Sequence, residues 1–377
     1  MKKSSLRWVP AIAIPAVVIA GAVAIPQMAS ADVKLPSKSA AGIVAFAEKS
    51  VGTSFTGSVT ETADLGLPDL SSFSTGAGSS SGSDVQDALS QLTGTHKAKV
   101  YVDGTTKQRV QTLDDLKETD VIRNGRTVWA YDSEKKTATR LTLRDASHDM
   151  DWQVGTGKTP LATDAPTTPT EAAQKALDAI GRYTAVKVSD NVRVAGQKAY
   201  QITLTPKDDT TLVGRVTLAV DGKTGVPLRV VVKAKGQSDP AFSVAFTSIS
   251  YDKPSADTFT FTPPKGTKVE QVKAPQYQRD FNTGLTPKSL SKDSAIAKAR
   301  AEAQPVVLGS GWSTIVGAKL PSGALSGDST GMLDQVLTKV DGGRVLQTAL
   351  VSVYLTDDGH VYVGAVKASA LEAAAQK

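Results

Sequence analysis

Alternating apolar and polar residues, separated by Asx-Gly dipeptides, constrain the fold of this chain more than any other feature. The pattern begins at Thr95, and turn dipeptides stand at Asp103-Gly104, Asn124-Gly125 and Asp221-Gly222. A tight hairpin turn needs positive φ values, which Gly and Asn tolerate, so the pattern predicts β-hairpins. We expect a meander of antiparallel strands over 95–103, 106–113, 119–124, 127–132, 137–143, 184–194, 198–205, 213–221, 226–235 and 241–251, preceded by a strand at 54–62.

Few helices are available to cover such a sheet. Ala40, Ile43, Val44 and Ala47 have helical spacing, which predicts a short amphipathic helix within 34–51. Further helices are expected at 83–92, 168–182, 291–303 and 330–340. A wide sheet with one apolar face needs a cover. Either the helices fill the concave face completely, or a ligand occupies what they leave.

The N-terminal segment has the pattern of a signal peptide. Three basic residues precede an apolar run from Trp8 to Ile25, and Ala29-Ser30-Ala31 stands before Asp32. Small residues at these positions are typical of a signal-peptidase site, so cleavage is expected between Ala31 and Asp32. An uncleaved membrane anchor is the alternative, because the apolar run is near spanning length. Three prolines in the segment weaken a continuous spanning helix. We therefore expect an extracytoplasmic protein, either secreted or held in the cell envelope.

Composition removes several classes of function. The 377 residues include no cysteine and three histidines, which excludes thiolate nucleophiles and disulfide scaffolds and disfavours metal centres. The net charge is +6, and residues 1–31 carry three basic and no acidic residues. The remaining 40 basic and 37 acidic residues leave a balance of +3, which gives no electrostatic case for binding nucleic acid. No cofactor and no metal are expected.

Motifs that suggest catalysis have simpler explanations. Gly78-Ser79-Ser80-Ser81-Gly82 matches a nucleophile elbow by letter but lies in a Gly/Ser-rich tract rather than at a strand-to-helix turn. Gly157-Lys158-Thr159 resembles the end of a P-loop, but Trp152 stands where the fingerprint needs glycine. The paired aspartates fall at predicted turns, where Asp caps backbone donors: Asp114-Asp115, Asp208-Asp209 and Asp357-Asp358. We assign no catalytic residue, although a hydrolase with distant Asp residues stays open.

Candidate ligand-binding residues are apolar. Trp129 and Tyr131 alternate with smaller residues in one strand and so share a face. Phe242, Val244 and Phe246 do the same in another strand. Core packing and the lining of a lipid pocket are both compatible with this pattern, because small-molecule sites are concave and mostly apolar. The candidates are Trp129, Tyr131, Leu228, Val230, Val232, Phe242, Val244 and Phe246.

Several stretches resemble the bacterial LolA/RseB-like superfamily of lipoprotein carriers and related regulators. FTFTPPKGTKVEQV (259–272), preceded by VDGKTGVPLRVVV and FTSISYDKP, resembles the end of LolA. VIRNGRTVWAYD (121–132) is similar to the family's paired strands, and Asp103-Gly104, Arg109 and Leu113-Asp114 resemble the N-terminal domain of RseB. The resemblance implies a mainly β fold: an unclosed antiparallel β-barrel with helices over its mouth and an apolar cavity for acyl chains. A strand arginine that gates the LolA lid is replaced here by Asp103-Gly104.

This resemblance sets the expected organisation and function. We expect a signal peptide (1–31), a LolA-like half-barrel (32–275), a linker (276–290) and a small C-terminal α+β unit (291–377). The expected function is a non-enzymatic, monomeric carrier or chaperone that binds an acyl lipid or lipoprotein. The alternative is an RseB-like envelope-stress regulator whose partner is a membrane-bound anti-sigma factor. A purely structural envelope protein, with a sheet filled by its own side chains, is a further alternative.

Overall fold

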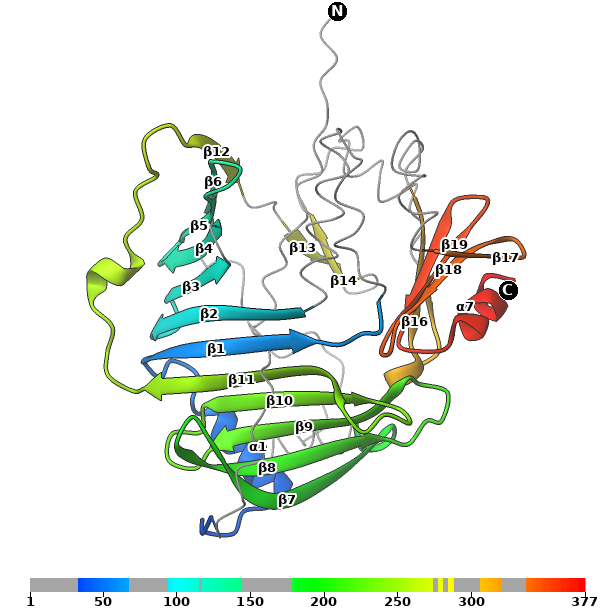
Figure 1. Cartoon of the computed structure of the whole chain (residues 1–377), viewed down its shortest axis with the longest axis horizontal. Helices are drawn as coiled ribbons and strands as arrows, with labels where there is room; N and C mark the ends of the chain where they lie inside the picture. Colours follow the sequence, from blue (N-terminus) through cyan, green and yellow to red (C-terminus); the bar gives the residue numbers. More distant parts are fainter. Residues whose placement is uncertain are drawn as a thin grey trace, which may run out of the picture.

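The protein is mainly β and contains one large unclosed sheet and one smaller sheet (Figure 1). This computed structural model describes residues 33–67, 94–114, 117–143, 178, 180–273, 277–280, 284–287, 306–320 and 337–376. The expected signal peptide and its cleavage site lie outside these ranges. Within them, no helix has the length and hydropathy needed to cross a membrane.

Twelve strands form the large sheet in the order β12-β6-β5-β4-β3-β2-β1-β11-β10-β9-β8-β7. Because β12 and β7 are its two edges, the sheet does not close into a barrel. The strands are β1 (Phe55–Ala63), β2 (Gly94–Asp103), β3 (Lys107–Asp114), β4 (Lys117–Asn124), β5 (Thr127–Asp132), β6 (Thr137–Thr142), β7 (Thr184–Val194), β8 (Gln197–Pro206), β9 (Val213–Asp221), β10 (Pro227–Ala234), β11 (Pro240–Ser250) and β12 (Lys268–Lys273).

The predicted meander is confirmed, and its turns use the expected chemistry. Gly104 and Gly125 have φ values of 71° and 60°, a region that favours glycine. Asp221 ends β9, and its Oδ1 accepts hydrogen bonds from the backbone N–H groups of Lys223 (3.0 Å) and Thr224 (2.6 Å). Asp208 likewise accepts from the N–H of Thr210 at 2.8 Å. These aspartates hold turns, as predicted.

β12 is the one strand of the large sheet that pairs in parallel, and the sequence did not predict it as a strand. After β11 the chain passes through a short 3-10 helix, η2 (Ala256–Phe259), before β12 pairs with β6. Figure 1 shows this segment running from β11 to β12 past the ends of the intervening strands. We call residues 251–267 the strap. Because the strap returns the chain to the far edge of the sheet, β12 enters in the same direction as β6.

The first predicted helix is confirmed as α1 (Ala40–Glu48). The Ser39 hydroxyl caps its start by accepting a hydrogen bond from the Gly42 N–H at 3.1 Å. Ile43 is fully buried and packs in one cluster with Tyr200, Ile202 and Val220, so α1 lies against β8 and β9. The helices expected at 83–92 and 291–303, and most of the one at 168–182, lie outside the described residues.

The smaller sheet has six strands in the order β15-β16-β20-β19-β18-β17. Its strands are β15 (Val306–Leu308), β16 (Ile315–Lys319), β17 (Thr338–Val340), β18 (Gly343–Gln347), β19 (Ser352–Thr356) and β20 (His360–Gly364), with a 3-10 turn η3 (Gly311–Ser313) and helix α7 (Ala368–Ala375). The Asp357-Asp358-Gly359 turn between β19 and β20 is confirmed.

Three details of this smaller unit differ from the sequence-based prediction. The end of the helix expected at 330–340 is strand β17, because Asp341 and Gly342 form a turn that pairs it with β18. The residues before the 357–359 turn, whose alternating apolar side chains predict one hairpin arm, form the two strands β18 and β19, because the Thr348 N–H and hydroxyl both bond to the Val351 carbonyl and reverse the chain. Helix α7 was not predicted.

Direct contacts join the two sheets. The Thr211 hydroxyl and the Leu212 N–H each donate to the Ala365 carbonyl at 2.7 Å. The Trp312 indole N–H donates to the Thr184 hydroxyl at 2.8 Å. The interval expected as a linker contains an antiparallel pair, β13 (Tyr277–Asp280) and β14 (Gly284–Pro287).

Candidate binding face

Strand register divides the large sheet into two faces of different chemistry. Residues that are directly opposite on neighbouring strands share a face, and successive residues alternate between faces. Val59 of β1 pairs with Ala98 and Phe246, whereas the next residue, Thr60, pairs with Lys97 and Ala245. Following these pairs gives an apolar face and a polar face. The apolar face includes Phe55, Val59, Val100, Val110, Val230, Val232, Phe242, Val244 and Phe246.

The centre of the apolar face is tightly packed around Phe246. Its ring is 5% exposed and meets Phe55 edge to face, with centroids 5.7 Å apart. Gly57 provides the space for this ring, because a Cβ at that position would lie 2.5 Å from Phe246 Cε1. The same cluster includes Val59, Val100, Val244 and Leu228, all buried. Residues from β1, β2, β10 and β11 therefore form one continuous apolar surface.

The structure brings most of the predicted ligand-binding residues together. Leu228, Val230, Phe242, Val244 and Phe246 belong to the cluster around Phe246. Val232 is half-buried beside it and lies directly opposite Phe242.

Trp129 and Tyr131 lie elsewhere. Through β4, β3 and β2 the register connects them to Tyr101 and to Thr56 of β1, which is on the polar face. Both rings contact Phe261 of the strap, each with centroids 5.4 Å apart. These two aromatics thus share a face, as expected, but it is opposite to the face that carries Phe246.

Helix α1 covers only one end of the apolar face. Its residue Ile43 packs against β8 and β9. Leu218 of β9 belongs to the same cluster and lies directly opposite Val230 of β10. The apolar face therefore continues from the strands under α1 to β10, β11, β1, β2 and β3.

One ionisable pair interrupts the apolar face. Glu61 of β1 lies directly opposite His96 of β2 and, on its other side, Val244 of β11. Burial raises the pKa of the Glu61 carboxyl, and the charge of His96 partly opposes this rise. Sequence reasoning did not select Glu61. Its signal was its position between Val59 and Ala63 on the inward-facing side of the alternation.

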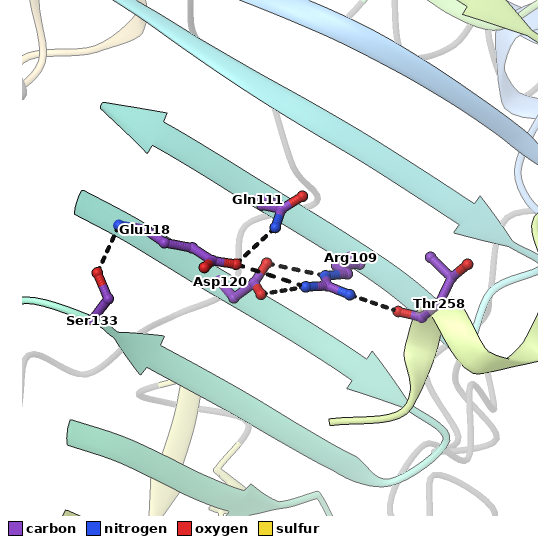
Figure 2. Close-up of polar contacts among 6 residues, drawn as sticks. All are labelled: Arg109, Gln111, Glu118, Asp120, Ser133 and Thr258. Carbon is purple, nitrogen blue, oxygen red and sulfur yellow. Dashed lines mark hydrogen bonds and ion pairs between the residues drawn. The ribbon is translucent and has the colours of Figure 1, made fainter. Parts of the chain in front are cut away.

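On the opposite, polar face, a charged cluster fastens the strap to β3 and β4 (Figure 2). Arg109 donates from Nε to Asp120 Oδ1 at 3.1 Å and from Nη2 to Oδ2 at 2.5 Å. Its Nη1 donates to the Thr258 carbonyl of the strap at 3.3 Å. Glu118 accepts a hydrogen bond from Gln111 Nε2 at 2.7 Å and lies 3.9 Å from Arg109 Nη2. One arginine thus holds two strands and the strap.

Electrostatics in this cluster follow from burial. The Asp120 side chain is 1% exposed and that of Arg109 is 21% exposed. Burial is the largest cause that raises the pKa of Asp120; Arg109 opposes this rise and Glu118 adds to it. The bond to Asp120 raises the pKa of Arg109. The paired charges are structural, because the strap occupies the space above them. Among the residues described, no group of three His, Asp or Glu side chains could hold a metal ion.

A protein-family model and one relative match parts of this chain. Residues 63–272 match the DUF2092 family, described as predicted periplasmic proteins. An outer-membrane lipoprotein carrier protein of Photobacterium profundum is 30% identical over 151 residues, which is 40% of this chain and 60% of that relative. The chain thus spans about three fifths of the carrier's length.

Two solved structures are similar to this chain at low sequence identity. The Pseudomonas aeruginosa MucA/MucB complex structure matches at 14% identity and a TM-score of 0.42, over 89% of this chain and 96% of the other. A LolA superfamily protein from Nitrosomonas europaea matches at 13% identity and a TM-score of 0.24, over 60% and 99%.

The family match covers more than half of the chain and includes most of the strands that build the two faces. The expected resemblance to lipoprotein carriers is confirmed by the carrier relative. The protein is extracytoplasmic, and it belongs to the DUF2092 family of predicted periplasmic proteins.

Proposed function

We propose that this protein is a non-enzymatic binding protein that shields acyl chains against the apolar face of its large sheet. The observation that carries the proposal is the continuity of that face, which runs from Val110 on β3 through Val100, Val59 and Val244 to Val230 on β10. The name of the relative, a lipoprotein carrier, supports the same ligand class.

The energetics favour an apolar ligand. Each methylene removed from water contributes about 0.8 kcal/mol. A chain of a dozen or more carbons could therefore be held strongly with few hydrogen bonds. Phe242 and Val232 are directly opposite each other and half-buried, so they extend the apolar face beyond its packed centre. We assign the contact surface to these residues together with Val230 and Val244.

The test compares two substitutions on β10. Val230→Asp places a charge on the apolar face, where burying an unpaired carboxylate is costly, so we expect at least about a tenfold loss of bound acyl lipid. Lys233→Asp is the control, because Lys233 faces the other way and its Nζ bonds to the Ser238 carbonyl. The protein is isolated from a bacterial envelope without detergent, and bound lipid is counted by native mass spectrometry and solvent extraction.

The result can contradict the proposal in two ways. If both variants are shown to be folded and lose lipid equally, the assignment of acyl binding to the apolar face is contradicted. If the wild-type protein carries no acyl lipid and binds no added fluorescent fatty acid, the proposal that its ligand contains an acyl chain is contradicted.

A regulator that binds a membrane-anchored anti-sigma factor is the second candidate. It is favoured by the six-stranded sheet, which an acyl-chain carrier does not need and which is joined to the large sheet through Thr211 and Ala365. A pull-down of the whole protein against membrane extract distinguishes the two. A stoichiometric membrane-protein partner supports regulation, whereas bound lipid without a protein supports transport.

A further inference from the structure

The polar face of the large sheet carries basic side chains without acidic ones along most of its width. In the described strands β2, β1 and β11 to β7, the acidic residues that the register places on this face are Asp103 and Asp221, which end β2 and β9 and bind locally, while Asp190 of β7 lies in a register shift. The basic residues, which we call the basic face, are Lys97, Lys99, Lys187, Arg215, Arg229 and Lys233.

The basic residues follow the rows of the sheet. Lys97, Thr60, Ala245 and Arg229 are directly opposite one another on β2, β1, β11 and β10. Three strand spacings place the backbones of Lys97 and Arg229 about 14 Å apart. The side chains between them, Thr60 and Ala245, are small, and Arg229 itself reaches toward Gln201 of β8, on the side away from Lys97.

A groove lies at the β2 end of this row. Its volume is about 540 Å³, and its lining includes Lys97, Lys99, Ser58, Thr60, Thr247 and Gln111. Lys97 and Lys99 are exposed, and neither has an ion-pair partner among the residues that the structure describes. Ammonium groups and hydroxyls are hydrogen-bond donors that suit an anionic oxygen.

Arg229 adds a buried donor without an acceptor. Its Nη2 donates to Gln201 Oε1 at 2.9 Å, across the fully buried Ala219, but its Nε is buried and has no hydrogen-bond partner. Buried polar atoms usually have a partner, so an orphaned guanidinium N–H calls for an explanation. An anion at the rim of this site would supply the missing negative charge.

This arrangement of charge is not required by the fold. Lys233 of β10 and Arg215 of β9 are directly opposite each other, and like charges in that position destabilise a sheet. A pair of opposite charges at these two positions would stabilise the sheet. A basic face that costs stability therefore indicates an anionic partner.

We propose that the basic face docks on a membrane surface that contains anionic phospholipid. A protein partner is less suited to it, because protein interfaces are usually anchored by aromatic residues. The polar face of β1 and of β8 to β11 has none among the residues described, and the aromatic residues of this face lie toward its other side, with Tyr101 on β2 and Trp129 and Tyr131 on β5. Each basic residue close to such a membrane strengthens binding by about fivefold. The docking site lies opposite the proposed acyl-binding face and goes beyond that function.

The test is flotation of the envelope-isolated protein with two kinds of vesicle. We expect the protein to bind phosphatidylcholine vesicles in which about one third of the lipid is phosphatidylglycerol, and to bind them more weakly as salt is added. Binding to pure phosphatidylcholine vesicles should be weak. The double variant Lys97→Gln/Lys99→Gln should bind about 25-fold more weakly, from two losses of about fivefold. The control Lys319→Gln/Lys339→Gln removes two exposed lysines of the smaller sheet and should bind like the wild type.

Three results would overturn the docking site. They are equal binding to both vesicle types, equal behaviour of the two double variants, and capture of an acidic protein without any vesicle binding. Bound acyl lipid is measured on the same samples. Lys97→Gln/Lys99→Gln should retain it, so failure of membrane docking and failure of acyl binding are separate outcomes.

Discussion

Replacing Arg109 by Met tests whether the charged cluster under the strap is held by ion pairing. The Asp120 carboxylate, 1% exposed, would lose both bonds from Arg109, and the Thr258 carbonyl would lose its donor. Removing one partner of a buried ion pair costs about 3–5 kcal/mol, because an uncompensated charge stays inside. Arg109 is itself 21% exposed, so we expect the lower end, about 3 kcal/mol.

The loss should depend on pH, with a sign that follows from Asp120. Burial already raises the pKa of this carboxyl, and Arg109 opposes the rise. Without Arg109 the folded-state pKa rises further above the unfolded value of about 3.9. The variant is then penalised most above that raised pKa and regains stability as pH falls from it toward about 4, because the folded state binds the proton more tightly.

Urea unfolding at several pH values measures both effects, with Trp129 as a fluorescent reporter next to the strap. The control is Arg215→Met, an exposed arginine on the same face, which should change stability by less than about 0.5 kcal/mol. A loss below about 1 kcal/mol for Arg109→Met, or one that does not change with pH, would refute the ion-pair argument. Replacing both partners by apolar residues, Arg109→Met with Asp120→Leu, should restore most of the stability.

Two further predictions concern the apolar face and a turn. Gly57→Ala should cost about 1–3 kcal/mol, because its Cβ would lie 2.5 Å from the Phe246 ring and 2.7 Å from the Ser248 carbonyl, whereas Gly181→Ala meets nothing within 4 Å and should change urea stability little. Asp221→Ala removes three hydrogen bonds at the β9–β10 turn and should lower stability by about 1–3 kcal/mol, while Asp221→Asn, which keeps an acceptor, should lose less. An unchanged urea midpoint in either Ala variant would contradict the corresponding contact.

Local signals in the sequence were enough for the strands and turns of the large sheet. Alternation and Asx-Gly dipeptides predicted β2 to β11 in order, because each hairpin is specified by residues close in the chain. The same signals missed β12, whose partner β6 is more than 120 residues earlier. They also missed β17, a strand of three residues, since so short a segment has too few alternations to be distinguished from a helix end.

The candidate binding residues show a different limit. Alternation tells which residues of one strand share a face, and Trp129 and Tyr131 do. It does not tell how the faces of β5 and β11 correspond, because that depends on every register between them. The pairing through β4, β3, β2 and β1 shows that Trp129 and Tyr131 lie on one face of the sheet and Phe246 on the other. The proximity of Arg109 and Asp120 depends on the register of one hairpin only, because these residues lie on the neighbouring strands β3 and β4.

The opposite placement of the two proposed sites has a consequence for their energetics. Val230 and Lys97 lie on different faces and on strands that are separated by β11 and β1. Substitutions without shared partners usually add in free energy. A combined Val230→Asp/Lys97→Gln/Lys99→Gln variant should therefore lose acyl lipid as Val230→Asp does and vesicle binding as the lysine variant does, with no coupling. Coupling between them would mean that acyl binding and membrane docking use one surface, which the register of the sheet opposes.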